Sequence, residues 1–130
     1  MSPGFDPGAL LARHYALPNG PRVCLRLVRS RDRAGIRELF DAHGRLVDDL
    51  ELTRLVTFDL TRRLVLVATA LIDTSETVVG VGAIDLGEQA SGGPTLVLVD
   101  DDRTEGLDDL LADALIGHAS AIARARARAA

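Results

Sequence analysis

The stretch from Pro94 to Ala123 constrains the fold more than any other part of the chain. It starts with the apolar run TLVLV and passes through an acidic turn that contains Gly106 into a long amphipathic segment. Acidic residues crowd the start of that segment and arginines its end, the order that a helix dipole favours. A strand over Thr95–Val99, a turn and a helix are therefore predicted, and free N–H groups at such a junction favour an anion. The helix buries one face, formed by Leu107, Leu110, Leu111, Ala114, Leu115, His118, Ala119 and Ile122.

Composition excludes several classes of protein. The chain has 130 residues, enough for one domain, with 47% hydrophobic and 26% charged residues, as is usual for a soluble protein. Its net charge of −4, 3% aromatic content and lack of Trp argue against nucleic acid or an anionic membrane as a partner. No apolar run is long enough to span a bilayer, and the start MSPGFDPG does not resemble a signal peptide, which predicts a cytoplasmic protein.

The remaining elements follow from periodicity and capping signals. Residues 1–19 are predicted to form an N-terminal arm, with Ala9–Tyr15 either a short helix or extended, and a tight turn at Asn19-Gly20. Residues 20–130 form the domain. A first helix is expected to start at Ser30 or Asp32 and to end at Gly44. The other predicted elements are a helix over Leu46–Phe58 and strands over Val23–Val28, Leu64–Ile72 and Thr77–Leu86.

Three successive strands with short connections predict an antiparallel meander. Gly80 and Gly82 lie within the second of these strands and indicate a bulge or a close approach of another backbone. With helices covering the faces of the sheet, the fold class is α+β.

This order of elements resembles the GNAT superfamily, the acetyl-CoA-dependent N-acetyltransferases. VCLRLVRSRDRAGIRELFDAHG is similar to the family's first strand and helix, with Arg26 on the strand and Asp32 at the helix start. LVLVATALIDTSETVVGVGAIDL resembles its second and third strands. TLVLVDDDRTEGLDDLLADAL is similar to its fourth strand and cofactor-binding helix. The resemblance covers about residues 20 to 125 and implies a mostly antiparallel sheet flanked by helices.

The resemblance also implies where a cofactor would bind. In that family the fourth strand, which ends here at Val99, offers its backbone to the pantetheine arm of acetyl-CoA. The following loop, of pattern Arg/Gln-x-x-Gly-x-Gly/Ala, wraps the pyrophosphate with N–H groups. The matching positions are Arg103, Thr104, Glu105, Gly106, Leu107 and Asp108.

Four departures from the family pattern predict a domain without acetyl transfer. Asp108 stands where glycine or alanine is expected, and with the neighbouring acids it repels a phosphate. The strand at 95–99 carries no carboxylate, and the one tyrosine, Tyr15, precedes the motif, so no catalytic residue is assigned. The family's later strands are also missing from the sequence, which therefore resembles the first part of the fold.

An incomplete sheet would expose an apolar edge strand, so a homodimer or a partner chain that completes the sheet is expected. The histidines His14, His43 and His118 lack the spacing of metal ligands, and no metal site is predicted. Cys24 is read as a small core residue.

Three hypotheses for function remain. The first is an inactive GNAT-like domain that acts in assembly or regulation and binds no cofactor. The second is an active N-acetyltransferase that uses acetyl-CoA and whose site a dimer partner completes. The third is an unrelated α+β protein-interaction module.

Overall fold

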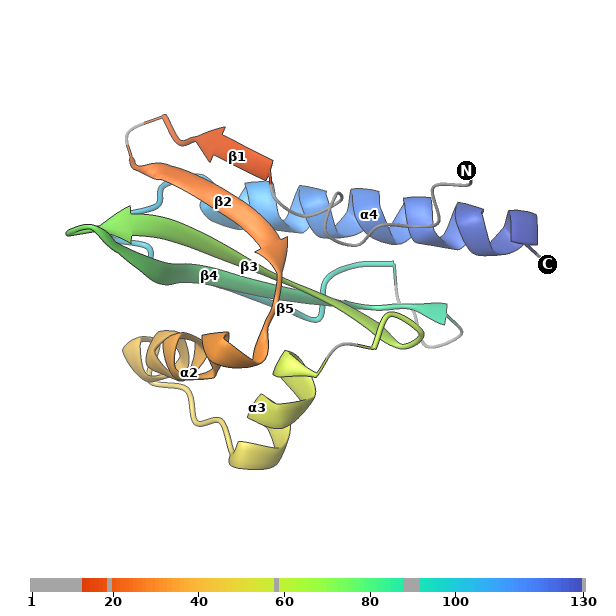
Figure 1. Cartoon of the computed structure of the whole chain (residues 1–130), viewed down its shortest axis with the longest axis horizontal. Coiled ribbons are helices and arrows are strands. Elements are labelled where there is room, and N and C mark those ends of the chain that lie inside the picture. The colour runs from red at the N-terminus through yellow and green to blue at the C-terminus, as the bar shows by residue number, and fades with distance from the viewer. Residues whose placement is uncertain (1–12, 19, 58, 88–91, 130) are drawn as a thin grey trace.

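The computed structural model describes residues 13–18, 20–57, 59–87 and 92–129, and in them a five-stranded antiparallel sheet lies between two helical layers (Figure 1). The strands are β1 (Arg13–Ala16), β2 (Arg22–Leu27), β3 (Arg63–Ile72), β4 (Ser75–Asp85) and β5 (Leu96–Val99), and their order in the sheet is that of the sequence. The α+β class and the meander of β3, β4 and β5 are confirmed. β1 was not among the predicted strands. It pairs with β2 from within the segment predicted to be an arm.

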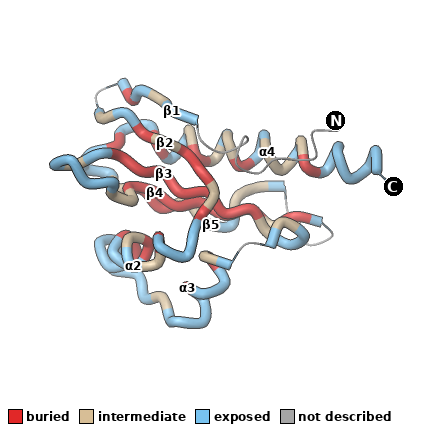
Figure 2. Tube along the Cα trace, viewed as in Figure 1, coloured by how far each residue is buried: buried red, intermediate tan, exposed pale blue. Residues whose placement is uncertain are grey.

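The helices cover opposite faces of this sheet. The short 3₁₀ turn η1 (Ser30–Asp32), α2 (Arg33–Ala42) and α3 (Asp49–Val56) lie on one face, and α4 (Leu107–Ala129) lies on the other (Figure 1). Each face has its own buried cluster: Phe40 and Leu52 belong to one, and Leu111 and Leu115 to the other. Figure 2 shows that burial concentrates in the sheet between the two layers. No helix in the described parts of the chain is long and apolar enough to cross a membrane.

Two glycines of β4 let α4 lie close to the sheet. A Cβ atom at Gly82 would approach Leu115 Cδ1 to 2.7 Å, and one at Gly80 would approach Leu111 Cδ1 to 3.0 Å. The register between β3 and β4 also shifts between Ala68 and Thr69, which is the signature of a bulge. The predicted bulge is therefore confirmed, whereas the close approach is made by leucine side chains of α4 rather than by another backbone. Since α4 passes Gly80 before Gly82, it runs in the same direction as β4.

The first helix starts and ends where the sequence predicts, with Asp32 at the N-cap position of α2. Gly44 has a φ of +65°, and the Arg45 N–H donates to the Phe40 carbonyl at 2.9 Å, as in a Schellman cap. At the start, the Asp32 side chain does not cap α2. It accepts from the Arg29 N–H at 2.7 Å and from the guanidinium of Arg26 instead.

The second helix is shorter than predicted. Asp48 is its N-cap, with Oδ1 accepting from the Glu51 N–H at 2.7 Å, so the helix starts at Asp49 rather than Leu46. Leu46 lies outside the helix with 98% of its surface exposed, and Leu50 is 61% exposed. Leu52 and Leu55 form the buried face instead. The prediction of a helix over Leu46–Phe58 was wrong at its start because it followed the apolar spacing rather than the capping signal of Asp48.

Candidate functional site

In the loop between β5 and α4, three donors converge on one backbone carbonyl, that of Asp100. The Asp100 carbonyl accepts from the N–H groups of Arg103 and Thr104, each at 3.1 Å, and from Thr104 Oγ1 at 2.6 Å. Thr104 is consequently buried, and its own carbonyl accepts from the Leu107 N–H at 3.0 Å. Three N–H groups of the loop are therefore already bonded within it.

Gly106 sets the direction in which α4 leaves the loop. Its φ of +88° is in the left-handed region that glycine adopts without steric cost. Its carbonyl accepts from the Leu110 N–H at 3.2 Å, which places it just before the first turn of α4. The glycine of the predicted motif thus shapes the backbone at the helix start.

A hollow of about 400 Å³ lies over this loop. Of the seven residues that the sequence proposes for cofactor binding, the hollow collects Arg103, Thr104, Glu105, Gly106 and Asp108. Val99 and Leu107 are buried and do not line it. Two residues not in the proposed set, Asp101 and Asp102, complete the lining.

The charge of this hollow is strongly negative. Asp101, Asp102, Glu105 and Asp108 bring four carboxylates to it, whereas Arg103 brings one guanidinium. That guanidinium is itself close to an acid outside the lining, with Nε 3.8 Å from Asp100 Oδ2. A helix N-terminus attracts anions, but the carboxylates around this one already complement its dipole.

The outer edge of β5 forms a second side of the site. The Asp100 N–H donates to the Val79 carbonyl at 2.8 Å, in register with the pairs Leu98–Val81 and Leu96–Ala83. Because alternate residues of a strand point their backbone polar groups in opposite directions, Val97 and Val99 point theirs away from β4. His43 at the end of α2 reaches this edge, where its Nε2 donates to the Val99 carbonyl at 2.8 Å.

Sequence reasoning considered His43 as a metal ligand and missed this contact. The available signal was its position directly before the glycine that ends α2, where a side chain is free to leave the helix. Tyr15 lies on β1, at the opposite edge of the sheet from β5. It does not line the hollow.

A buried ion pair links β2 to the start of α2. The guanidinium of Arg26 donates to both oxygens of Asp32 at 2.8 Å and to Glu76 Oε1 at 2.7 Å. Burial alone would raise the pKa of Asp32, but the bonds from Arg26 and from the Arg29 N–H lower it below its usual range. The same bond to Asp32, aided by Glu76, raises the pKa of Arg26. Arg26 and Asp32 were matched to the family's first strand and helix, and here they are direct partners.

The residues considered for metal binding do not converge. Within the described ranges, no group of three or more His, Cys, Asp and Glu side chains is placed to hold a metal ion. His118 is half-buried on α4, where burial and the nearby charge of Arg13 lower its pKa. Cys24 is half-buried rather than fully in the core, and it is not in a disulfide.

The fold and the site were compared with known proteins in three ways. No protein-family model matches the chain, and neither a curated protein nor a solved structure matches it.

Proposed function

We propose that this chain is a GNAT-like domain that binds no acetyl-CoA and transfers no acetyl group, and that it acts through protein assembly or regulation. The order of elements supports the GNAT-like part. Strands β2 to β5, with α2 and α3 on one face and α4 on the other, follow the arrangement that the sequence resemblance implies.

One observation carries the proposal: the loop that would hold a pyrophosphate is acidic and internally bonded. At an effective dielectric constant of about 20, a phosphate charge about 5 Å from one carboxylate is repelled by roughly 3 kcal/mol before screening by salt and water. Four carboxylates line the hollow, and the N–H groups of Arg103, Thr104 and Leu107 donate to carbonyls of the loop itself. The residues present therefore do not fit the pyrophosphate of acetyl-CoA.

The outer edge of β5 also supports a domain that binds no acetyl-CoA. A pantetheine arm would need the outward backbone groups of β5, and His43 Nε2 is bonded to the Val99 carbonyl there. The resemblance implies a carboxylate on or near the fourth strand that deprotonates the amine and a tyrosine that protonates the leaving thiolate. No carboxylate lies on β5, and Tyr15 lies at the opposite edge of the sheet, so neither step has a residue assigned to it.

Thermal unfolding with acetyl-CoA tests the proposal. A ligand that binds only the folded state at about 100 times its Kd adds roughly 2.7 kcal/mol of stability. The Tm of the unmodified chain is expected to stay constant as acetyl-CoA is raised. The triple variant Asp101→Asn/Asp102→Asn/Asp108→Gly is expected to gain a ligand-dependent rise in Tm, since it removes three charges and the side chain at position 108.

A control variant, Asp41→Asn, changes an exposed acid of α2 outside the hollow and is expected to gain no response. If the unmodified chain itself gains Tm in proportion to acetyl-CoA, the proposal is wrong and an active N-acetyltransferase becomes the better hypothesis. If the triple variant folds but does not respond either, the acidic loop is not what prevents binding, and an unrelated α+β interaction module is favoured.

A further inference from the structure

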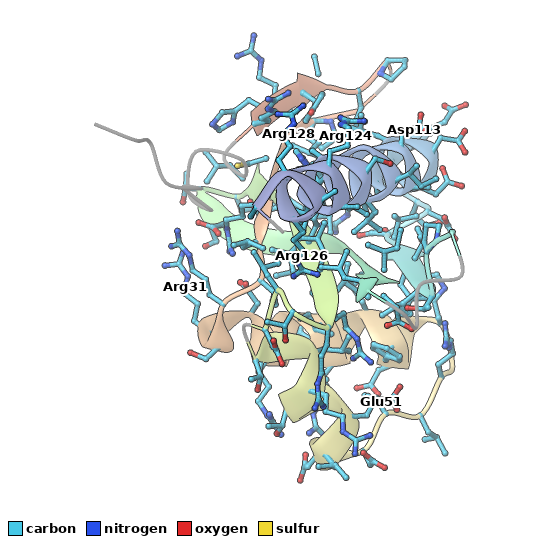
Figure 3. The ribbon with its side chains drawn as sticks, turned by 90° about the vertical axis from the view of Figure 1, so that its right-hand side faces the viewer. Arg31, Glu51, Asp113, Arg124, Arg126 and Arg128 are labelled. Carbon is cyan, nitrogen blue, oxygen red and sulfur yellow. The ribbon has the colours of Figure 1, made fainter. Side chains whose placement is uncertain are left out.

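The face of α4 that points away from the sheet carries a regular pattern of charges. One face of the helix is buried through Leu107, Leu111, Leu115 and Ile122. On the opposite face, exposed residues recur every three or four positions; they are Asp109, Asp113, Gly117, Ser120, Arg124 and Arg128. Figure 3 shows Asp113, Arg124 and Arg128 on this outer side of the helix, and Arg126 on the side facing the sheet.

The four charged residues of this outer face have no partner in the part of the chain that the structure describes. The side chains of Asp109, Asp113, Arg124 and Arg128 form no hydrogen bond or ion pair with the described residues. Arg126, two residues from Arg124, differs because its guanidinium donates to the Leu60 carbonyl. Packing within one copy therefore explains Arg126 and leaves the outer charges without a role.

The residues in the middle of the same face have small side chains. Gly117 lies inside a 23-residue helix, where glycine is less favourable than alanine. A Cβ atom there would meet no atom within 4 Å, so the contacts described within one copy do not require glycine. Ser120 follows one turn later, and Ile116 beside them is 42% exposed. A second backbone can approach the helix closely at this point.

The charges on this face complement those on a second copy of the helix when the two helices lie antiparallel. Consider a two-fold axis at the midpoint between His118 and Ala119. Asp109 and Arg128 are equally far from that midpoint, as are Asp113 and Arg124, and as are Gly117 and Ser120. Asp109 then faces Arg128 of the partner subunit, and Asp113 faces the partner's Arg124. In a parallel arrangement, acids would face acids and arginines would face arginines.

We infer that the outer face of α4 is a homodimer interface in which two copies of the helix pack antiparallel. This deepens the proposed assembly function, since it identifies the partner as a second copy of the chain and gives the register. Two-fold interfaces place the same patch on both copies, which is the condition that this charge order meets. The exposed Ile116 and the small residues Gly117 and Ser120 form the centre, and four opposite-charge pairs form the rim.

Sedimentation velocity over a series of protein concentrations tests the interface. The unmodified chain is expected to dimerise, more weakly as salt is raised, because the rim pairs are exposed and screened. Two variants reverse one half of the pattern each: Arg124→Glu/Arg128→Glu and Asp109→Arg/Asp113→Arg. Each alone is expected to weaken dimerisation at least tenfold. Their equimolar mixture is expected to restore it, because both ends then face the opposite charge.

Two further variants separate the interface from folding and net charge. Arg22→Glu/Arg54→Glu changes net charge as much as the first variant but lies elsewhere, and it is expected to leave the dimer unchanged. Gly117→Leu places a side chain in open space in a single copy, so its far-ultraviolet circular dichroism is expected to match the unmodified chain while its dimer dissociates.

Several results would overturn the inference. A monomer at every concentration would do so, as would a dimer that none of the α4 variants weakens, which would place the interface elsewhere. Failure of the two charge-reversed variants to recover on mixing would exclude the antiparallel register. The acetyl-CoA response is measured separately, so a monomeric chain with no such response would reject this interface and leave the lack of cofactor binding standing.

Discussion

Arg26 and Asp32 show how two residues connect distant parts of this fold. Both side chains are more than nine-tenths buried, and the fork of Arg26 matches the two oxygens of Asp32. Such a pair adds little when compared with apolar side chains of the same size, but removing one partner leaves a buried charge uncompensated. The bond from Arg26 to Glu76 extends the link to the start of β4. β2, the start of α2 and β4 are therefore joined at one guanidinium.

Asp32→Asn is expected to destabilise the fold by about 3 kcal/mol, because Arg26 then stays buried without the charge of its bidentate partner. Urea unfolding followed by circular dichroism measures this. The double variant Arg26→Met/Asp32→Leu removes both charges and is expected to recover most of the loss. Equal losses in the single and double variants would contradict a charge-based role.

The same pair predicts a dependence on pH. The pKa of Asp32 is lower in the folded chain than in the unfolded one, where it is about 3.9. Its ionised form thus stabilises the fold above that pH, and this contribution is lost as the pH falls through the folded pKa. The stability of the unmodified chain relative to the double variant should therefore be constant above about pH 5 and fall in more acidic solution.

At the scale of elements, capping residues decided boundaries that apolar spacing did not. Gly44 ends α2 with a left-handed residue, as predicted, because few other residues adopt that φ without strain. Asp48 starts α3 by accepting the Glu51 N–H, and this leaves Leu46 in solvent. An exposed leucine before a cap is compatible with the fold because the buried face of α3 is formed by Leu52 and Leu55.

Asp48→Ala is expected to lower the free energy of unfolding by about 1 kcal/mol, since it leaves the Glu51 N–H without its acceptor. Asp48→Asn keeps an acceptor oxygen and should lose less than half as much. Leu46→Ser should be neutral because that side chain is solvent-exposed. Chemical denaturation of the three variants is the measurement, and a large loss for Leu46→Ser would show that the helix starts earlier.

At the scale of the whole molecule, one sheet contributes side chains to two hydrophobic cores, one on each of its faces. Alternate side chains of β3 point to opposite faces, so Leu64 and Leu66 pack with α4 whereas Val65 and Val67 pack with α2 and α3. Neither helical layer has a buried face without the sheet. The two cores are therefore expected to unfold together rather than in sequence.

Leu111→Ala opens the core on the α4 face, and Phe40→Ala opens the one on the α2 and α3 face. Each is expected to lower the free energy of unfolding by about 3 to 5 kcal/mol, in the range typical of such truncations. Calorimetry should show one transition for each variant, shifted to lower temperature. A second transition in either variant, with one unshifted, would mean that the layers fold independently.

The sequence alone was sufficient for features that depend on neighbours along the chain. Strand alternation, helical periodicity and the left-handed glycine predicted the meander, the position of α4 and the end of α2, because side-chain direction follows backbone geometry locally. The seven residues proposed for a cofactor also came from local pattern, and five of them line one hollow because they lie within six consecutive positions at the start of α4.

Tertiary structure decided what depends on residues far apart in the chain. The bond from His43 to the Val99 carbonyl and the link from Arg26 to Glu76 join segments whose separation carries no periodic signal. Hydrogen bonds select partners by distance and angle in space, and a one-dimensional pattern does not specify either.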